Sequence, residues 1–192
     1  MIPSYLADLD LPAVFAAYTS TPCKYLQESV KDEHVVDSTS QGVSGFVSAS
    51  FGQAENLAKK YFAVENPTAH PYALLQIDNG FIKSIGTKKC DCAIANDKDI
   101  CFVEFKANAT KDTPSALRTN YRKAMAQLST TIDLFNAHYS SKGTDLKKLR
   151  KVEAYICFRE GYPKSTSSQM NCKVRFMAQN GIPLSFERKK IL

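Results

Sequence analysis

Two segments of the chain have a hydrophobic pattern that predicts their secondary structure directly. Over residues 114–139, apolar residues recur at steps of three and four, which is the spacing of one face of an α-helix. This stripe consists of Tyr121, Met125, Leu128, Ile132, Phe135 and Tyr139. The run VEAYICF, residues 152–158, is apolar almost throughout, and this predicts a strand that is buried on both faces.

Upstream of the long helix, capping and turn signals predict a helix that is followed by strands. Ser50 and Gln53 have the spacing of a capping box, which predicts a helix over residues 51–63, and the prolines of NPTAHP end it. The runs YALLQI and FIKSIG flank Asn79-Gly80, a pair that favours the tight turn of a β-hairpin.

Both ends of the chain are expected to add elements to this core. Near the C-terminus, CKVRFMAQ and LSFER, within residues 172–188, predict two further strands. Residues 1–47 are expected to form an N-terminal helical appendage, because LPAVFAAY and PCKYLQESVKDEHVV favour short helices and a Ser/Gly-rich loop follows them. Residues 48–192 would then form the main domain. The order helix, three strands, helix, strand predicts an α/β fold in which helices flank a mixed central sheet.

The stretch CDCAIANDKDICFVEFK, residues 90–106, predicts another hairpin, with charged residues at its end. A two-residue turn at Asp97-Lys98 pairs residues whose numbers sum to 195, so Asp91 lies opposite Glu104. Side chains alternate along a strand, so Lys106 is on the same face as Glu104. Like charges on cross-strand neighbours repel each other, and a divalent cation between them would relieve that repulsion.

These residue types suit a metal site that hydrolyses phosphodiesters. Carboxylate oxygens without nitrogen or sulfur ligands favour Mg²⁺ or Mn²⁺. An ammonium two residues from the metal can orient or deprotonate a water and can stabilise charge on a phosphate. Glu55 lies on an otherwise apolar row of the helix predicted over 51–63. Its carboxylate is therefore either at the edge of the packed face or directed at the same metal.

The same charges also fit a simpler arrangement, an exposed ion pair across the hairpin, because Glu and Lys are common on solvent-exposed faces. The neighbours argue against it, since Ala93, Ile100 and Phe102 on the carboxylate face are apolar, as is the opposite face. A strand that is apolar on both faces is buried on both, and carboxylates at its end are costly there. Glu55 alone also fits an ordinary helix surface.

Charge, cysteines and hydropathy narrow the class of protein. The 192 residues carry a net charge of +6, which permits a phosphate-rich partner without requiring one. No apolar run has the length of a membrane span and the N-terminus lacks a basic secretory start, so we expect a cytoplasmic protein with no membrane partner. The six cysteines include no C-x-x-C pair, so we expect structural thiols rather than a zinc site.

Basic residues flank the charged hairpin in the sequence and are candidates for contacts with a nucleic-acid backbone. They are Lys88, Lys89, Lys111, Arg118, Arg122 and Lys123. Tyr121 and Tyr162 are candidates for stacking on bases. The alternative for the basic residues is an ordinary solvated face.

The charged hairpin resembles the signature of the PD-(D/E)xK nuclease superfamily, which includes type II restriction enzymes, archaeal Holliday-junction resolvases and RecB-type nucleases. Asp91 matches the aspartate of that signature, and VEFK supplies its E-x-K with Glu104 and Lys106. Glu55 matches the acidic residue that many members carry in the first core helix. The resemblance extends over residues 48–160 or so, and Cys90 stands where the family pattern has proline.

The resemblance implies a restriction-endonuclease-like core and a nuclease, endo- or exonucleolytic, that uses Mg²⁺ or Mn²⁺ to cleave nucleic acid, with DNA favoured over RNA. It implies that Asp91, Glu104, Glu55 and the carbonyl of Phe105 hold the metal, and that Lys106 lies beside the attacking water. The catalytic set is then Asp91, Glu104, Lys106 and Glu55.

Gln127 on the long helix is comparable to the glutamine of the RecB-type Q-x-x-x-Y motif. Thr131 stands where that motif has tyrosine, so the motif is not carried over.

Three hypotheses remain open from the sequence. The first is the metal-dependent nuclease, for which a homodimer or a specificity-giving partner subunit would suit cleavage of both strands of a duplex. The second is the same fold as a non-catalytic module that binds nucleic acid or protein. The third is an unrelated α/β domain with Asp, Glu and Lys clustered on its surface.

Overall fold

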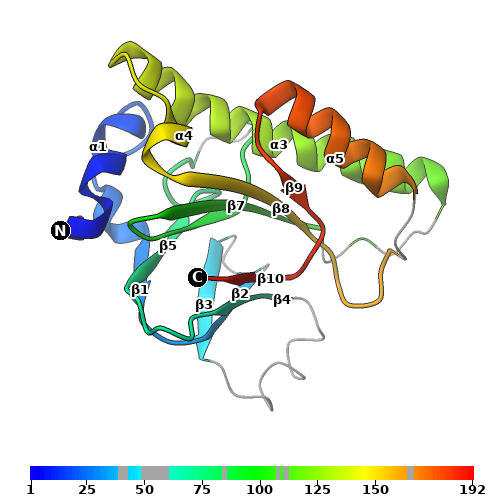
Figure 1. Ribbon diagram of the computed structural model, residues 1–192, viewed down its shortest axis with the longest axis horizontal. Helices are drawn as coiled ribbons and strands as arrows, with labels where there is room; N and C mark the ends of the chain where they lie inside the picture. The colour runs from blue at the N-terminus through cyan, green and yellow to red at the C-terminus, as the bar shows by residue number, and fades with distance from the viewer. Residues whose placement is uncertain (39–42, 49–60, 84–85, 107–108, 110–112, 164–166) are drawn as a thin grey trace.

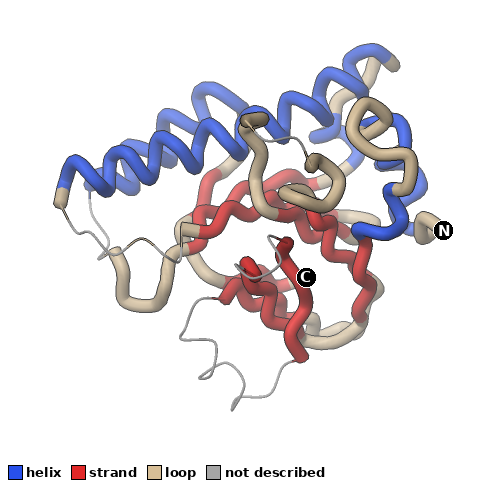
Figure 2. Tube along the Cα trace, turned by 180° about the vertical axis from the view of Figure 1, so that it is seen from behind, coloured by secondary structure: helices blue, strands red, loops and turns tan. Residues whose placement is uncertain are grey.

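A six-stranded sheet lies between a layer of helices and a second, four-stranded sheet in the computed structural model (Figure 1). The description covers residues 1–192 except 39–42, 49–60, 84–85, 107–108, 110–112 and 164–166. The helices α1, α3, α4 and α5 lie along one face of the large sheet, and the view from behind shows the same layering (Figure 2). The domain is thus α/β with a mixed central sheet, as the sequence predicts.

The strands of the large sheet run in the order β1-β5-β6-β7-β8-β9, with β7 parallel to β8 and β8 parallel to β9 and the other neighbours antiparallel. Their bounds are Leu26–Ser29 for β1, Tyr72–Gln76 for β5, Cys92–Ala95 for β6, Asp99–Phe105 for β7, Lys151–Cys157 for β8 and Leu184–Ser185 for β9. The small sheet has the order β10-β4-β2-β3. Its strands are β2 (Glu33–Ser38), β3 (Val43–Ser48), β4 (Tyr61–Glu65) and β10 (Lys189–Ile191).

In the described ranges the α-helices are α1 (Leu11–Val14), α3 (Pro114–Ser141), α4 (Leu146–Leu149) and α5 (Ser167–Asn180), and 3₁₀ turns occupy Ser4–Leu9 and Pro22–Tyr25. None of the helices in the described ranges has the length and apolar character needed to cross a membrane.

Alternation along the strands divides the apolar residues between two cores. Ala93 of β6 and Phe102 of β7 face the helices and pack with the α3 stripe. Ile94 and Cys101, one position along, face the small sheet and pack with residues such as Phe62 of β4. Both faces of β6 and β7 are covered, and this explains why apolar residues follow one another without interruption along these strands.

The charged hairpin has the predicted register. Cys92 pairs with Val103 and Ala95 pairs with Ile100, so paired numbers sum to 195. Asn96 closes the turn, because its side-chain oxygen accepts hydrogen bonds from the backbone amides of Lys98 and Asp99. This bonding is typical of Asn at the start of a tight turn.

The long helix and the buried strand are also confirmed. All members of the predicted α3 stripe are buried except Met125, which is partly exposed at the edge of the packed face. Thr113 caps the helix with its side-chain oxygen, and Pro114 occupies the first turn, where proline is well tolerated. β8 lies between β7 and β9, and its second half is fully buried.

Two predicted strands are wrong, and one predicted helix is tested only at its C-terminal end. The helix predicted over 51–63 falls outside the described residues up to 60, and residues 61–63 belong to strand β4. FIKSIG forms no strand within the described residues. An isolated bridge joins Asp78 and Ile82 across the turn at Asn79, whose φ is 56°. CKVRFMAQ is part of helix α5 rather than a strand.

The N-terminal residues differ from the helical segment that the sequence suggests. Within PCKYLQESVKDEHVV, a short 3₁₀ turn leads into strands β1 and β2, so the predicted helix is wrong. β1 pairs with β5 at the edge of the large sheet. Leu6, Leu11 and Phe15 are fully buried in the core under the helices. Residues 1–29 therefore pack into the same core as the sheet that carries the charged hairpin.

Candidate active site

Two carboxylates and an ammonium meet at one end of the β6–β7 hairpin, on the face that α3 covers. Glu104 and Lys106 lie at the end of β7, two residues apart, so their side chains share that face. Asp91 directly precedes β6 and, by the register, lies opposite Glu104. Asp91 is 9% exposed and Glu104 1% exposed, which rules out the simple surface ion pair.

Backbone and side-chain hydrogen bonds hold Asp91 at this end of the hairpin. Its carbonyl oxygen accepts from the amides of Ile77 and Asp78, at 3.0 and 3.1 Å. Its carboxylate oxygen Oδ2 accepts from the amide of Phe105, at 2.5 Å. The Asp91 carboxylate is therefore directed across the hairpin to the strand that carries Glu104.

Lys106 links the carboxylates to helix α3. Its ammonium, on a side chain that is 18% exposed, donates to Oε1 of Glu104 and, at 3.0 Å, to Oε1 of Gln127. The ammonium partly compensates the buried charge of Glu104, which would otherwise be costly. Gln127, on helix α3, fixes the direction of the Lys106 side chain from the helical layer.

Helix α3 also anchors the segment that leads into Asp91. Gln127 donates from Nε2 to the carbonyl of Lys89, at 3.0 Å, and the hydroxyl of Thr131 accepts from the amide of Cys90, at 2.9 Å. Residues 127 and 131 are one helical turn apart and so face the sheet together. The two side chains take the place of a neighbouring strand for residues 89 and 90.

These two anchors are the site residues that sequence reasoning missed. Thr131 stands where the RecB-type motif has tyrosine, yet Gln127 and Thr131 act as a pair on the backbone. The signal was present in the sequence, since both polar residues lie beside the apolar stripe of a helix predicted to pack on the sheet.

Cys90, next to Asp91, has a structural role. It is fully buried, and burial raises the pKa of its thiol well above the ordinary value, an effect that the Thr131 hydrogen bond only partly offsets. A thiol that stays protonated is neither a nucleophile nor a metal ligand. The other buried cysteines, 92, 101, 157 and 172, are likewise free thiols.

The predicted metal ligands suit a hard divalent cation, but one of them lies outside the described residues. Asp91 and Glu104 supply carboxylate oxygens, the ligands that Mg²⁺ and Mn²⁺ prefer. Among the residues that the structure describes, no three His, Cys, Asp or Glu side chains come together as a metal-binding group. Glu55, the third predicted carboxylate, lies outside the described residues, and the Phe105 carbonyl as a ligand stays a prediction.

The predicted basic residues fall into two groups. Lys88, Arg122 and Lys123 are exposed and line a hollow that Gln127 also borders, next to the carboxylates. The Lys89 side chain is 8% exposed and lies 3.2 Å from a carboxylate oxygen of Asp78, so it is turned away from solvent. Lys111 lies outside the described residues, and Arg118 is exposed near the start of α3.

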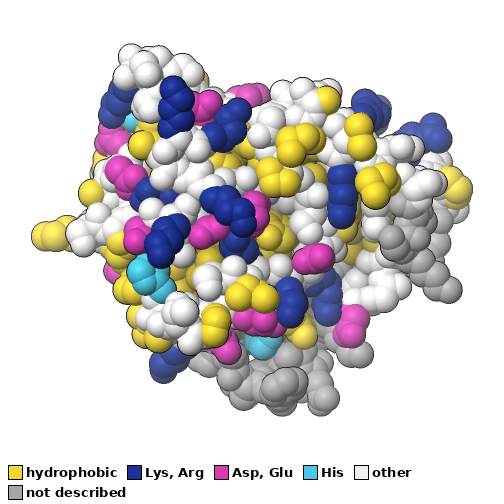
Figure 3. Space-filling model, viewed as in Figure 1, with side chains coloured by type: hydrophobic (Ala, Val, Ile, Leu, Met, Phe, Trp, Pro, Cys, Tyr) yellow, Lys and Arg dark blue, Asp and Glu magenta, His cyan; other side chains and the backbone are white. Residues whose placement is uncertain are grey.

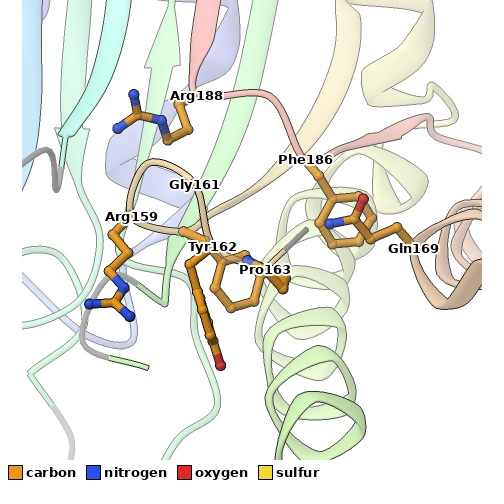
Figure 4. Close-up of a pocket in the computed structure, with 8 residues that line it drawn as sticks. Arg159, Gly161, Tyr162, Pro163, Gln169, Phe186 and Arg188 are labelled. Carbon is orange, nitrogen blue, oxygen red and sulfur yellow. The ribbon is translucent and has the colours of Figure 1, made fainter. Parts of the chain in front are cut away.

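A second hollow opens beside the end of β8 (Figure 4). β8 is the parallel neighbour of β7, and the amide of Lys106 donates to the carbonyl of Cys157, so residues after 157 lie next to the candidate site. The hollow is lined by aromatic rings and guanidinium groups, including Tyr162 and Arg159, whose guanidinium carbon lies 5.0 Å from the centre of that ring. Aromatic and arginine side chains are suited to stacking on bases.

Comparison of the chain with models of protein families, with curated proteins and with solved structures finds no match.

Proposed function

We propose that the protein is a metal-dependent nuclease with a restriction-endonuclease-like core, which hydrolyses phosphodiester bonds of nucleic acid. The observation that carries the proposal is the register of the β6–β7 hairpin. It aligns Asp91 with Glu104 and leaves Lys106 on the same face, under cover of α3. Carboxylates are costly to bury even where an ammonium such as that of Lys106 donates to one of them, and buried clusters of charge are frequent at functional sites.

In this proposal Asp91 and Glu104 hold Mg²⁺, which would lower the pKa of a bound water and neutralise charge on the phosphate. Lys106 orients the attacking water or donates to the phosphate oxygen that gains charge. Its hydrogen bond to Gln127, at 3.0 Å, keeps the ammonium next to the carboxylates before substrate arrives. Gln127 and Thr131 are positioning residues, since they act on Lys106 and on the backbone before Asp91.

DNA is the favoured substrate, and the sequence resemblance rather than the site geometry is the reason for that preference. The basic hollow beside Gln127 supports a polyanionic substrate, because Lys88, Arg122 and Lys123 are exposed there. The guanidinium groups that line the hollow after β8 also suit a polyanion, whereas Phe158 and Tyr162 are buried there.

Calorimetric titration of Mn²⁺ into the wild type, Glu104→Ala and a control, Glu187→Ala, tests the metal site. Glu187 is exposed and does not belong to the β6–β7 hairpin, so it reports on ions that bind to surface charge alone. The same proteins are then incubated with plasmid, single-stranded DNA and RNA.

We expect the wild type and Glu187→Ala to bind the ion and to cut one of these polymers, and Glu104→Ala to do neither. If the wild type binds no ion even with nucleic acid present, the hairpin charges belong to a non-catalytic binding surface and the nuclease proposal is wrong.

A further inference from the structure

A groove with cationic walls runs between helices α3 and α5. It is a hollow of about 330 Å³, to which α3 contributes Arg118, Tyr121 and Met125 and α5 contributes Asn171, Cys172 and Arg175. Tyr121 and Cys172 are buried and form an apolar floor, whereas Arg118 and Arg175 are exposed on the two walls. One arginine from each helix therefore faces the same hollow.

The residues that the structure describes place no carboxylate beside these arginines. The first acidic residue of α3 is Asp133, more than three turns beyond Arg118, and the sequence from 161 to 186, which includes all of α5, contains neither Asp nor Glu. Within the described part of the chain, no carboxylate lies within 4.0 Å of Arg118, Arg122 or Arg175. Figure 3 shows dark-blue and yellow side chains over α5, without magenta acidic ones.

The groove is continuous with the candidate active site. Arg122 lines the groove and also the hollow that Lys88, Lys123 and Gln127 border. Gln127 in turn accepts a hydrogen bond from the Lys106 ammonium. Cationic side chains thus lead from the far end of the groove, at Arg175, to the residue that touches Lys106.

We propose that the groove between α3 and α5 binds the sugar-phosphate backbone of one nucleic-acid strand and leads it to Asp91 and Glu104. The inference rests on the proposed function. Arginine binds phosphate with paired hydrogen bonds, and Asn171 can donate to phosphate or sugar oxygens. The apolar floor at Tyr121 and Cys172 suits the sugar rings. An acidic protein segment would satisfy the charge, but the continuity with a phosphodiester site favours nucleic acid.

The test measures binding of a fluorescent oligothymidylate of about 20 nucleotides, longer than common single-strand site sizes, and of a duplex of similar length. Anisotropy is recorded in EDTA, so that no cleavage occurs, at several salt concentrations. The variants are Arg118→Ala/Arg175→Ala and, as a control, Lys148→Ala/Lys173→Ala. Both remove two exposed positive charges, but Lys148 and Lys173 do not line the groove.

For the better-bound probe we expect the double arginine variant to bind at least about tenfold more weakly than wild type and the double lysine variant to bind within about twofold. If both lost contacts are to phosphates, the slope of log affinity against log salt on the single strand falls by about 1.4, at 0.7 per contact. Equal effects of the two variants would overturn the inference, as would polyglutamate that binds as tightly as the oligonucleotide.

Failure of this inference and failure of the proposed function give different results. Arginine-dependent binding without any cleavage in Mn²⁺ would retain the groove and reject the nuclease. Metal-dependent cleavage by a protein whose binding does not depend on Arg118 and Arg175 would retain the nuclease and reject the groove.

Discussion

Thr131 offers a sharp test of how helix α3 positions the candidate site. The side chain is 1% exposed, and its hydroxyl accepts the amide hydrogen of Cys90 and donates to the carbonyl of Gln127. Thr131→Val keeps the shape of the side chain and removes only the hydroxyl, so little cavity forms. The Cys90 amide is then left buried, because valine offers no acceptor.

The expected cost follows from that orphaned amide. A buried donor that loses its acceptor destabilises a protein by about 1–3 kcal/mol. For a chain of this length, about 2 kcal/mol corresponds to a fall in Tm of about 4–8 °C. Cys90 directly precedes Asp91, so the carboxylate should also be less well placed, and Mn²⁺ should bind more weakly.

Urea unfolding and Mn²⁺ calorimetry measure the two effects. Thr130→Val is the matched control, because Thr130 is exposed and its hydroxyl donates to the Ala126 carbonyl one turn back in α3. We expect Thr130→Val to change the free energy of unfolding by less than about 0.5 kcal/mol. Thr131→Ser keeps the acceptor and should retain ion binding. If Thr131→Val is no less stable than Thr130→Val, the anchoring role of α3 is refuted.

Three further predictions address catalysis, pH and packing. Lys106→Met should lower the cleavage rate at least about 100-fold while calorimetry still detects Mn²⁺, and joint loss of both would contradict the role of Lys106. Burial opposes ionisation of Glu153, but hydrogen bonds from Lys151 and Lys190 outweigh it and lower its pKa from 4.5 to about 2. This stabilisation is complete above pH 4.5 and is lost as the pH falls towards 2. In urea unfolding, the free energy of unfolding of the wild type should exceed that of Glu153→Gln by about 3 kcal/mol less at pH 2 than at pH 4.5. A difference that does not depend on pH would disprove the prediction. Phe102→Ala removes a fully buried ring and should cost about 3–5 kcal/mol in the same assay, whereas a loss below about 1 kcal/mol would argue against tight packing there.

The sequence predicts those parts of the fold in which the spacing of hydrophobic residues fits one type of secondary structure alone. The α3 stripe, from Tyr121 to Tyr139, repeats over about five turns, and β8 is too apolar for an exposed element. The register of the β6–β7 hairpin follows from a two-residue turn and strict alternation. Asp91, Glu104 and Lys106 are therefore placed correctly relative to one another without any tertiary information.

The sequence predicts a strand where helix α5 lies, because a short segment fits both periods. Cys172, Val174 and Phe176 alternate with polar residues, as in a half-buried strand. In the structure only Cys172 and Phe176, one turn apart, are buried, and Val174 is 62% exposed. Five residues cannot distinguish the two patterns, and the packing of α5 against α3 decides between them.

The anchors Gln127 and Thr131 depend on information that no local pattern contains. Which backbone atoms they meet is set by how far α3 is displaced along the sheet. A polar residue beside an apolar stripe has the same sequence pattern whether it contacts solvent or a strand. The interlayer contacts of Lys106 with Gln127 are unpredictable for the same reason.

The two-sided burial of β6 and β7 has a consequence for the order in which the structure opens. Backbone amides exchange hydrogen with solvent only when their bonds break, and those in strands covered on both faces usually exchange through global unfolding. The hairpin is covered by α3 on one face and by the small sheet on the other. Its amides, including those that flank Glu104, should therefore exchange with the slowest group of the molecule. The carboxylates then belong to the cooperative unit that opens last, so a ligand meets a site that is already formed.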